Sequence, residues 1–182
     1  RDFSRVIIPL KKFGAKFKYK SNYRLPIEIK GASNPKPINY YESKGSAQCK
    51  SSVMLAALNT AGETSIKAKK SRDHTEILFR YLKIPIRLKK NKNFDIIKIK
   101  GQKQFLGFNY HIPSDISSSA FFIVLTLLSN KSKLVIKNVN VNPSRIGIIT
   151  ILKEMGAKIY FKNKKSYMGE KTADILIKSS NK

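Results

Sequence analysis

The chain has 182 residues, enough for one full domain or one and a half small ones, and 41% of them are hydrophobic, which supports a folded core. No apolar run reaches the roughly 18 residues of a transmembrane helix, so we expect no membrane association. The single cysteine, Cys49, excludes an internal disulfide and indicates a reducing, cytoplasmic compartment.

The formal net charge of +26 raises the question of a nucleic-acid partner. Thirty lysines and only seven arginines carry the positive charge. Proteins that recognise phosphates and bases usually do so with arginine side chains, which can donate two hydrogen bonds to one acceptor group. The lysines are spread along the chain and alternate with apolar residues, as in 16–20 and 97–100, which is typical of a solvated sheet face. A lysine-rich coding bias would give the same totals, and small anionic substrates would also be attracted. We therefore disfavour nucleic acid as the partner.

Hydrophobic periodicity and turn residues predict the elements in chain order. A helix over 5–14 is followed by strands over 16–20 and 25–31. Next come a strand (38–41), a helix (46–61), a strand (64–69), a helix (71–83) and strands over 85–90 and 94–100. The last set is a strand (108–112), a helix (114–128), a strand (133–139), a helix (143–155) and strands over 158–162 and 173–178.

These elements form an internal repeat. The end of a helix, a turn and two strands recur over 10–31, 79–101 and 152–178, with Gly14 and Gly156 where a helix C-cap needs positive φ. Each full unit reads β-α-β-α-β-β, and the chain holds the second half of one unit and then two complete units. It begins inside a helix, with Arg1 in place of a methionine, so we expect a fragment of a longer protein.

The two long helices lack a polar stripe. Residues 47–61 and 116–128 are mostly small or apolar, which predicts that they are buried in an interior with the sheets packed around them. The expected fold class is therefore α/β (α+β), with repeated βαβαββ units, helices inside and sheets outside.

The start of the 46–61 helix, Ser46-Ala47-Gln48, is the first candidate site. A buried helix leaves unpaired N–H groups at its N-terminus, and their partial positive charge suits an anionic ligand. The alternative is that Ser46 is only an N-cap, and this stretch taken alone favours that alternative.

The densest polar cluster is Ser71-Arg72-Asp73-His74-Thr75-Glu76. A catalytic interpretation makes His74 a base oriented by Asp73 or Glu76, but adjacent helix residues do not face each other and no nucleophile can be placed. We favour a helix start at which Arg72 and the helix dipole face an anion. Zinc-binding spacings, a P-loop and a dinucleotide fingerprint are absent from the sequence.

Several motifs together resemble one enzyme family. They are Ser-Ala-Gln-x-Lys-Ser at 46–51, Leu-x-x-x-Gly at 58–62, Ser-Arg-Asp-His-Thr-Glu at 71–76, Pro-Ser-Asp-Ile-Ser-Ser-Ser-Ala at 113–120 and Leu-Lys-Glu-Met-Gly-Ala at 152–157. Arg1 to Val6 is similar to that family's Arg-Pro-Met-x-Arg-Val stretch. In order and over essentially the whole chain, the sequence resembles 5-enolpyruvylshikimate-3-phosphate synthases, also called 3-phosphoshikimate 1-carboxyvinyltransferases. The sequence of 46–76 is closer to the bacterial class known for glyphosate-tolerant members than to the enteric class.

The resemblance implies an inside-out α/β barrel fold of two similar domains, each with three βαβαββ units. Residues 1–111 would be the later half of the sequence-continuous domain, and 112–182 the first unit of the other domain. The family transfers the enolpyruvyl group of phosphoenolpyruvate to the 5-hydroxyl of shikimate 3-phosphate and releases phosphate. This step belongs to the shikimate pathway to chorismate and aromatic amino acids. The implied enzyme is cytoplasmic and monomeric, and it needs no cofactor or metal.

The resemblance also implies roles for particular residues. Ser46 and Ala47 would bind the phosphate of shikimate 3-phosphate, Arg72 would clamp the same substrate, and Gln48 would touch both substrates. Arg1 would bind phosphoenolpyruvate as a bidentate fork. The family's acid–base groups and its N-terminal Lys-Ser…Arg loop have no counterpart in this chain, so no catalytic acid or base is assigned and we expect the chain alone to be inactive.

The sequence departs from the family pattern at a few positions. Asp2 and Phe3 replace Pro-Met, Gly45 stands where alanine is common, and Ser114 where glycine is common. One alternative is the UDP-N-acetylglucosamine enolpyruvyl transferase of the same fold. It requires a catalytic cysteine loop, whereas Cys49 lies in a helix expected to be buried. A basic nucleic-acid-binding module is a second alternative, but it predicts aromatic residues grouped with arginines on one strand face, and here they are scattered.

Overall fold

The computed structural model describes residues 2–101, 104 and 106–179. It divides into two compact units, Arg1–Leu106 and Gly107–Lys182, which we call unit 1 and unit 2. Each unit has its own cluster of buried hydrophobic side chains. The assignment of 1–111 and 112–182 to two enzyme domains stays a prediction.

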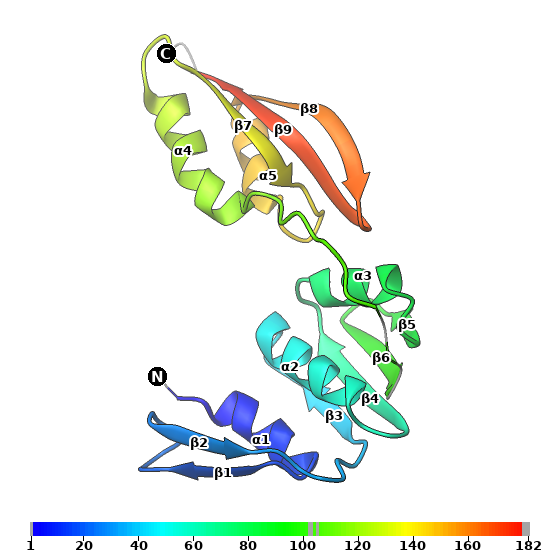
Figure 1. Cartoon of the computed structure of the whole chain (residues 1–182). Helices are drawn as coiled ribbons and strands as arrows, with labels where there is room; N and C mark the ends of the chain where they lie inside the picture. The colour runs from blue at the N-terminus through cyan, green and yellow to red at the C-terminus, as the bar shows by residue number, and fades with distance from the viewer. Residues whose placement is uncertain (1, 102–103, 105, 180–182) are drawn as a thin grey trace. The chain divides into compact units, whose positions relative to one another are not determined.

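Unit 1 contains two sheets (Figure 1). Helix α1 (Ser4–Lys12) precedes the antiparallel pair β1 (Lys16–Tyr19) and β2 (Ile27–Lys30). There follow β3 (Asn39–Glu42), α2 (Ala47–Leu58), β4 (Glu63–Lys69), α3 (His74–Tyr81), β5 (Ile86–Lys90) and β6 (Phe94–Lys100). The second sheet has the strand order β3-β4-β6-β5, in which only β3 and β4 pair in parallel.

Unit 2 repeats this plan. Its elements are α4 (Ile116–Leu128), β7 (Lys133–Asn140), α5 (Gly147–Glu154), β8 (Lys158–Tyr167) and β9 (Glu170–Lys178), and the strand order is β7-β9-β8. A single parallel bridge from Ser114 to Val139 occupies the place that β3 has beside β4. The predicted repeat is therefore confirmed as α1-β1-β2, α3-β5-β6 and α5-β8-β9. Gly14 and Gly156 follow their helices with φ of +103° and +87°, as predicted.

The period-two pattern of the strands separates core from surface. In β6, Asp95, Ile97 and Ile99 are buried, whereas Lys98 and Lys100 are exposed. Ile97 and Ile99 pack in one cluster with Val53, Met54 and Ala57 of α2 and with Ile66 of β4. This alternation confirms that lysines on these strands form a solvated face.

Several predicted boundaries are wrong. Residues 108–112 form no strand, and the only ladder contact nearby is the Ser114 bridge, because Pro113 has no N–H to continue the pairing. The helix predicted over 143–155 begins at Gly147, since Asn142 Oδ1 accepts from Ser144 N at 2.8 Å and closes a turn first. Strands β8 and β9 extend further than predicted and meet at a two-residue turn, Met168-Gly169, in which both residues have positive φ.

Helix α4 has two apolar sides. Ile116 and Ile123 are buried in the unit 2 cluster, but Phe121 is 80% exposed and Leu128 is 78% exposed. The prediction that this helix is buried all round is thus wrong within the described part of the chain, because its own sheet covers one side only.

Within the described ranges, no helix is long and apolar enough to cross a membrane.

Asp115 caps helix α4. Its Oδ2 accepts from Ser118 N at 2.9 Å, and its Oδ1 lies 2.8 Å from the guanidinium of Arg145. Burial acts to raise the pKa of this carboxyl, but the hydrogen bonds from Ser118 and Ser117 and the charge of Arg145 outweigh it. The pKa is therefore lowered from 3.8. A carboxyl with a lowered pKa stabilises the folded state above its unfolded pKa, and this contribution is lost as pH falls through the folded value.

We expect Asp115→Ala to destabilise the chain by about 1 kcal/mol at neutral pH, since a cap and an ion pair are lost. The difference from the unchanged chain should shrink as the pH falls below about 4, where the carboxylate becomes protonated. Urea unfolding followed by circular dichroism at several pH values measures this difference. Asp115→Asn is the matched control because it keeps a capping oxygen. A destabilisation that is equal at all pH values would contradict the assignment.

Candidate functional site

The first candidate position is the start of α2. Ser46 is the N-cap in extended conformation, and its Oγ accepts from Cys49 N at 3.3 Å. The hydroxyl hydrogen of Ser46 remains available to donate. The N–H groups of Ala47 and Gln48 belong to the first turn and have no partner within the helix, so this end carries partial positive charge. The N-cap alternative is therefore correct as a structural description, and it leaves donors directed out of the helix.

Gly45 explains how the chain enters this helix. Its φ is +68°, and a Cβ at this position would lie 3.2 Å from the carbonyl oxygen of Lys70. The chain before α2 therefore passes close to the chain that leaves β4 toward α3. Positive φ and close backbone approach both favour glycine here.

The second candidate position is the start of α3. The helix begins at His74, three residues later than predicted. Ser71, Arg72 and Asp73 therefore precede it. Asp73 occupies the N-cap position, but its side chain does not cap the helix, and its Oδ2 lies 3.5 Å from Lys90 Nζ. Arg72 is exposed. Its guanidinium is thus placed at the surface beside the helix start.

Side chains of α2 join these two helix starts. Lys50 Nζ donates to Arg72 O at 2.8 Å and lies 2.6 Å from Glu76 Oε1. The side chains of Lys50 and Glu76 are 2% and 3% exposed. One residue further along, Ser51 Oγ and Thr75 Oγ1 are 2.7 Å apart. The two sequence motifs, 46–51 and 71–76, therefore form one connected structure.

The start of α1 lies against the start of α2. Arg5 donates to Gln48 Oε1 at 3.4 Å. Beside this contact is a cavity of about 160 Å³, lined by Ser4, Arg5, Ile8, Pro9, Tyr40, Glu42, Ser43, Lys44 and Cys49. Burial raises the pKa of the Tyr40 phenol, and Cys49 and Glu42 raise it further. Cys49 itself is a buried free thiol, which confirms its interpretation as a small core residue.

The predicted ligand Arg1 lies outside the described residues. Its neighbour Asp2 accepts from Ser4 N at 2.7 Å and Ser4 Oγ at 2.8 Å, which places a carboxylate at the N-terminus of α1. Helix α1 therefore forms with Asp2-Phe3 in place of Pro-Met.

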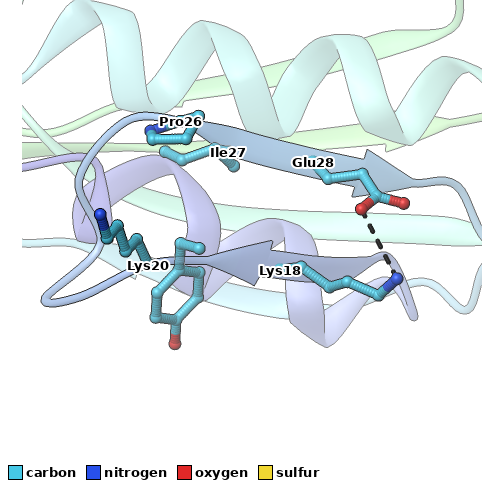
Figure 2. Close-up of a pocket in the computed structure, with 6 residues that line it drawn as sticks. Lys18, Lys20, Pro26, Ile27 and Glu28 are labelled. Atoms are coloured by element: carbon cyan, nitrogen blue, oxygen red, sulfur yellow. Dashed lines mark ion pairs between the residues drawn. The ribbon is translucent and has the colours of Figure 1, made fainter.

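A larger groove lies elsewhere, on the β1–β2 pair (Figure 2). It measures about 390 Å³ and is lined by Lys18, Tyr19, Lys20, Pro26, Ile27 and Glu28. Lys18 Nζ and Glu28 Oε2 are 3.5 Å apart across it, and both side chains are largely exposed. Exposed pairs of this kind contribute little, and none of the predicted site residues lines the groove. We therefore set it aside as the site.

Sequence reasoning named Ser46, Ala47, Gln48 and Arg72 as candidates and considered Glu76 as an orienter of His74. It did not single out Lys50 or Arg5. A signal for Lys50 existed: it is the only charged residue in α2, Ala47–Leu58, an otherwise apolar or small-residue helix. A charged side chain in such a helix needs a buried partner of opposite sign. No comparable signal in the sequence connects Arg5 to Gln48.

Comparison with known proteins gives one consistent result. The model of the family described as EPSP synthase (3-phosphoshikimate 1-carboxyvinyltransferase) matches residues 1–180. A 3-phosphoshikimate 1-carboxyvinyltransferase of Petrotoga mobilis is 42% identical over 183 residues, which cover 99% of this chain and 41% of the relative. That of Ruthia magnifica is 43% identical over 180 residues, covering 98% of this chain and 40% of the relative. The chain thus spans about two fifths of the length of these curated relatives.

Solved structures agree. EPSP synthase from Acinetobacter baumannii superposes with a TM-score of 0.81 at 37% identity, covering 98% of this chain and 40% of that one. The enolpyruvyl transferase NikO from Streptomyces tendae superposes with a TM-score of 0.62 at 11% identity, covering 98% and 42%. The second likeness shows the fold alone. The predicted enolpyruvyl transferase fold class is therefore confirmed.

Proposed function

The chain belongs to the EPSP synthase (3-phosphoshikimate 1-carboxyvinyltransferase) family, and we propose that it forms the middle part of such an enzyme. The reaction is transfer of the enolpyruvyl group of phosphoenolpyruvate to the 5-hydroxyl of shikimate 3-phosphate. Relatives of this name are more than twice as long as the aligned part, so the remaining catalytic groups belong to chain segments beyond these 182 residues.

The observation that carries the proposal is the junction of the two helix starts. Ser46, Ala47 and Gln48 begin α2, Arg72 precedes α3, and Lys50 links the two through Arg72 O. Helix N-termini and guanidinium groups are the groups that bind phosphate best in proteins. Both substrates of the proposed reaction are phosphorylated and anionic, which matches the N–H donors at the start of α2 and the guanidinium of Arg72.

We assign the roles as follows. Ser46, Ala47 and Arg72 bind the phosphate end of shikimate 3-phosphate, with the Ser46 hydroxyl donating while its oxygen caps α2. Gln48 contacts both substrates, and the Arg5 guanidinium at 3.4 Å orients its amide. Arg1 binds phosphoenolpyruvate. The high net charge of +26 would increase the local concentration of both substrates by long-range attraction.

The remaining features of the proposal concern the whole enzyme. Unit 1 belongs to the domain that is continuous in sequence, and unit 2 begins the other domain. The enzyme is a cytoplasmic monomer whose partners are the two small anions, with no nucleic acid and no membrane bound.

A hybrid enzyme tests this proposal. The 182 residues replace the aligned 183 residues of the Petrotoga mobilis relative, so that the relative supplies the flanking parts. We expect the hybrid to release phosphate from phosphoenolpyruvate in the presence of shikimate 3-phosphate, and the purified 182-residue chain alone to release none. A folded hybrid without turnover would contradict the proposed function. Turnover by the chain alone would contradict its assignment as part of an enzyme.

A further inference from the structure

Among the residues that the structure describes, Lys50 is the one buried lysine, and it lies beside the candidate site. Its Nζ has two acceptors, the main-chain oxygen of Arg72 at 2.8 Å and Glu76 Oε1 at 2.6 Å. At 2% exposure, the ammonium cannot contact a ligand at the surface. Any effect of Lys50 on binding must therefore act through the residues that it holds.

The position of Lys50 in α2 connects the two helix starts. It lies one helical turn after Ser46, and its own N–H donates to Ser46 O at 3.0 Å. Its side chain then reaches the backbone of Arg72 before α3 begins. A single residue is thus bonded to both segments that carry the proposed phosphate donors.

A buried ion pair such as Lys50–Glu76 need not be a source of stability. Two buried charges lose their hydration, and replacing such a pair by apolar side chains of similar volume is often neutral or stabilising. Apolar side chains would fill the same space but could not donate to Arg72 O. The ion pair therefore differs from an apolar pair in one respect: the Lys50 ammonium holds the main chain at Arg72 in a fixed position.

We propose that Lys50, held by Glu76, is a positioning residue that sets the place of Arg72 relative to the start of α2 and so tunes binding of the substrate phosphate. This inference rests on the proposed function for its substrate, shikimate 3-phosphate. Displacement of a binding group by about 1 Å can cost on the order of 100-fold in activity, so small shifts of Arg72 matter.

The test is the double variant Lys50→Met/Glu76→Leu placed in the Petrotoga mobilis hybrid, whose flanking parts supply the rest of the proposed substrate site. Phosphorus NMR measures its affinity for shikimate 3-phosphate, urea unfolding its stability, and amide hydrogen exchange the order of residues 71–74. We expect stability equal to or above that of the unchanged hybrid, a dissociation constant raised roughly 30- to 100-fold, and faster exchange at 71–74. Ile99→Val, which removes one buried methyl group of β6 in the same unit, should leave affinity unchanged.

Each outcome decides between the claims. A stable double variant with unchanged affinity and exchange would overturn the positioning role while leaving the proposed function intact. If the unchanged hybrid shows neither affinity for shikimate 3-phosphate nor turnover, the proposed function is contradicted. Hydrogen exchange at 71–74 then still decides whether Lys50 fixes this segment, because unchanged exchange would refute that claim by itself.

Discussion

Lys50→Met alone should lower the free energy of unfolding of unit 1 by about 3–5 kcal/mol. The substitution leaves the Glu76 carboxylate buried at 3% exposure without the ammonium that now lies 2.6 Å away. It also leaves Arg72 O without its donor. Removing one partner of a buried pair is far more costly than replacing both, since an isolated charge stays away from water.

Urea unfolding of three variants measures this effect. Lys50→Met should unfold at much lower denaturant than the unchanged chain, and the added change Glu76→Leu should bring stability back to that of the unchanged chain or above it. Lys69→Met removes an exposed lysine of β4 and should change stability by no more than about 0.5 kcal/mol. Equal stability of Lys50→Met and the unchanged chain would show that the pair is not buried as described.

Gly101→Ala should destabilise unit 1 by about 3 kcal/mol. A Cβ at Gly101 would collide with the carbonyl oxygens of Ala57 and Thr60 at the end of α2. These are main-chain atoms and cannot rotate away, so α2 or the chain after β6 has to shift. The hydrogen bond from Gly101 N to Gly62 O, 3.1 Å long, fixes this chain segment in place.

Gly31→Ala provides the matched control for this prediction, since a Cβ there meets no atom within 4 Å. Its effect should stay within about 0.5 kcal/mol. Circular dichroism during urea unfolding compares the two variants. If Gly101→Ala unfolds together with Gly31→Ala, the close approach of Gly101 to α2 is refuted.

The sequence predicted the repeat because local chemistry determines it. Gly14 and Gly156 have positive φ and mark the ends of helices, and the alternation of apolar and polar residues shows which face of each strand is buried. The order α1-β1-β2 and its two copies could therefore be predicted from the sequence alone. The 108–112 segment was mispredicted because alternation alone does not supply a pairing partner, and Pro113 stops the ladder. The exposed side of α4 could not be foreseen because composition does not say which surfaces meet.

The candidate site was predicted in part. Ser46 and Arg72 were recognised because small polar or cationic residues at the start of a helix are suited to binding an anion. Lys50 was overlooked although it is the only charged residue of α2, because it is one of thirty lysines and most of the others lie on solvated faces. Gly101 was not singled out either, since its contact with α2 joins residues that lie more than forty positions apart. Such tertiary contacts leave no periodic signal in the sequence.

The most direct test of the central claim is the turnover of the Petrotoga mobilis hybrid with and without Arg72→Gln. We expect the hybrid to form product and Arg72→Gln to lower kcat/KM for shikimate 3-phosphate roughly 100-fold, because the guanidinium proposed to bind this substrate is lost. Arg80→Gln, the same change at an exposed arginine of α3, should stay within about 2-fold. Equal kcat/KM for the Arg72 and Arg80 variants would contradict the claim that the start of α3 binds the substrate phosphate.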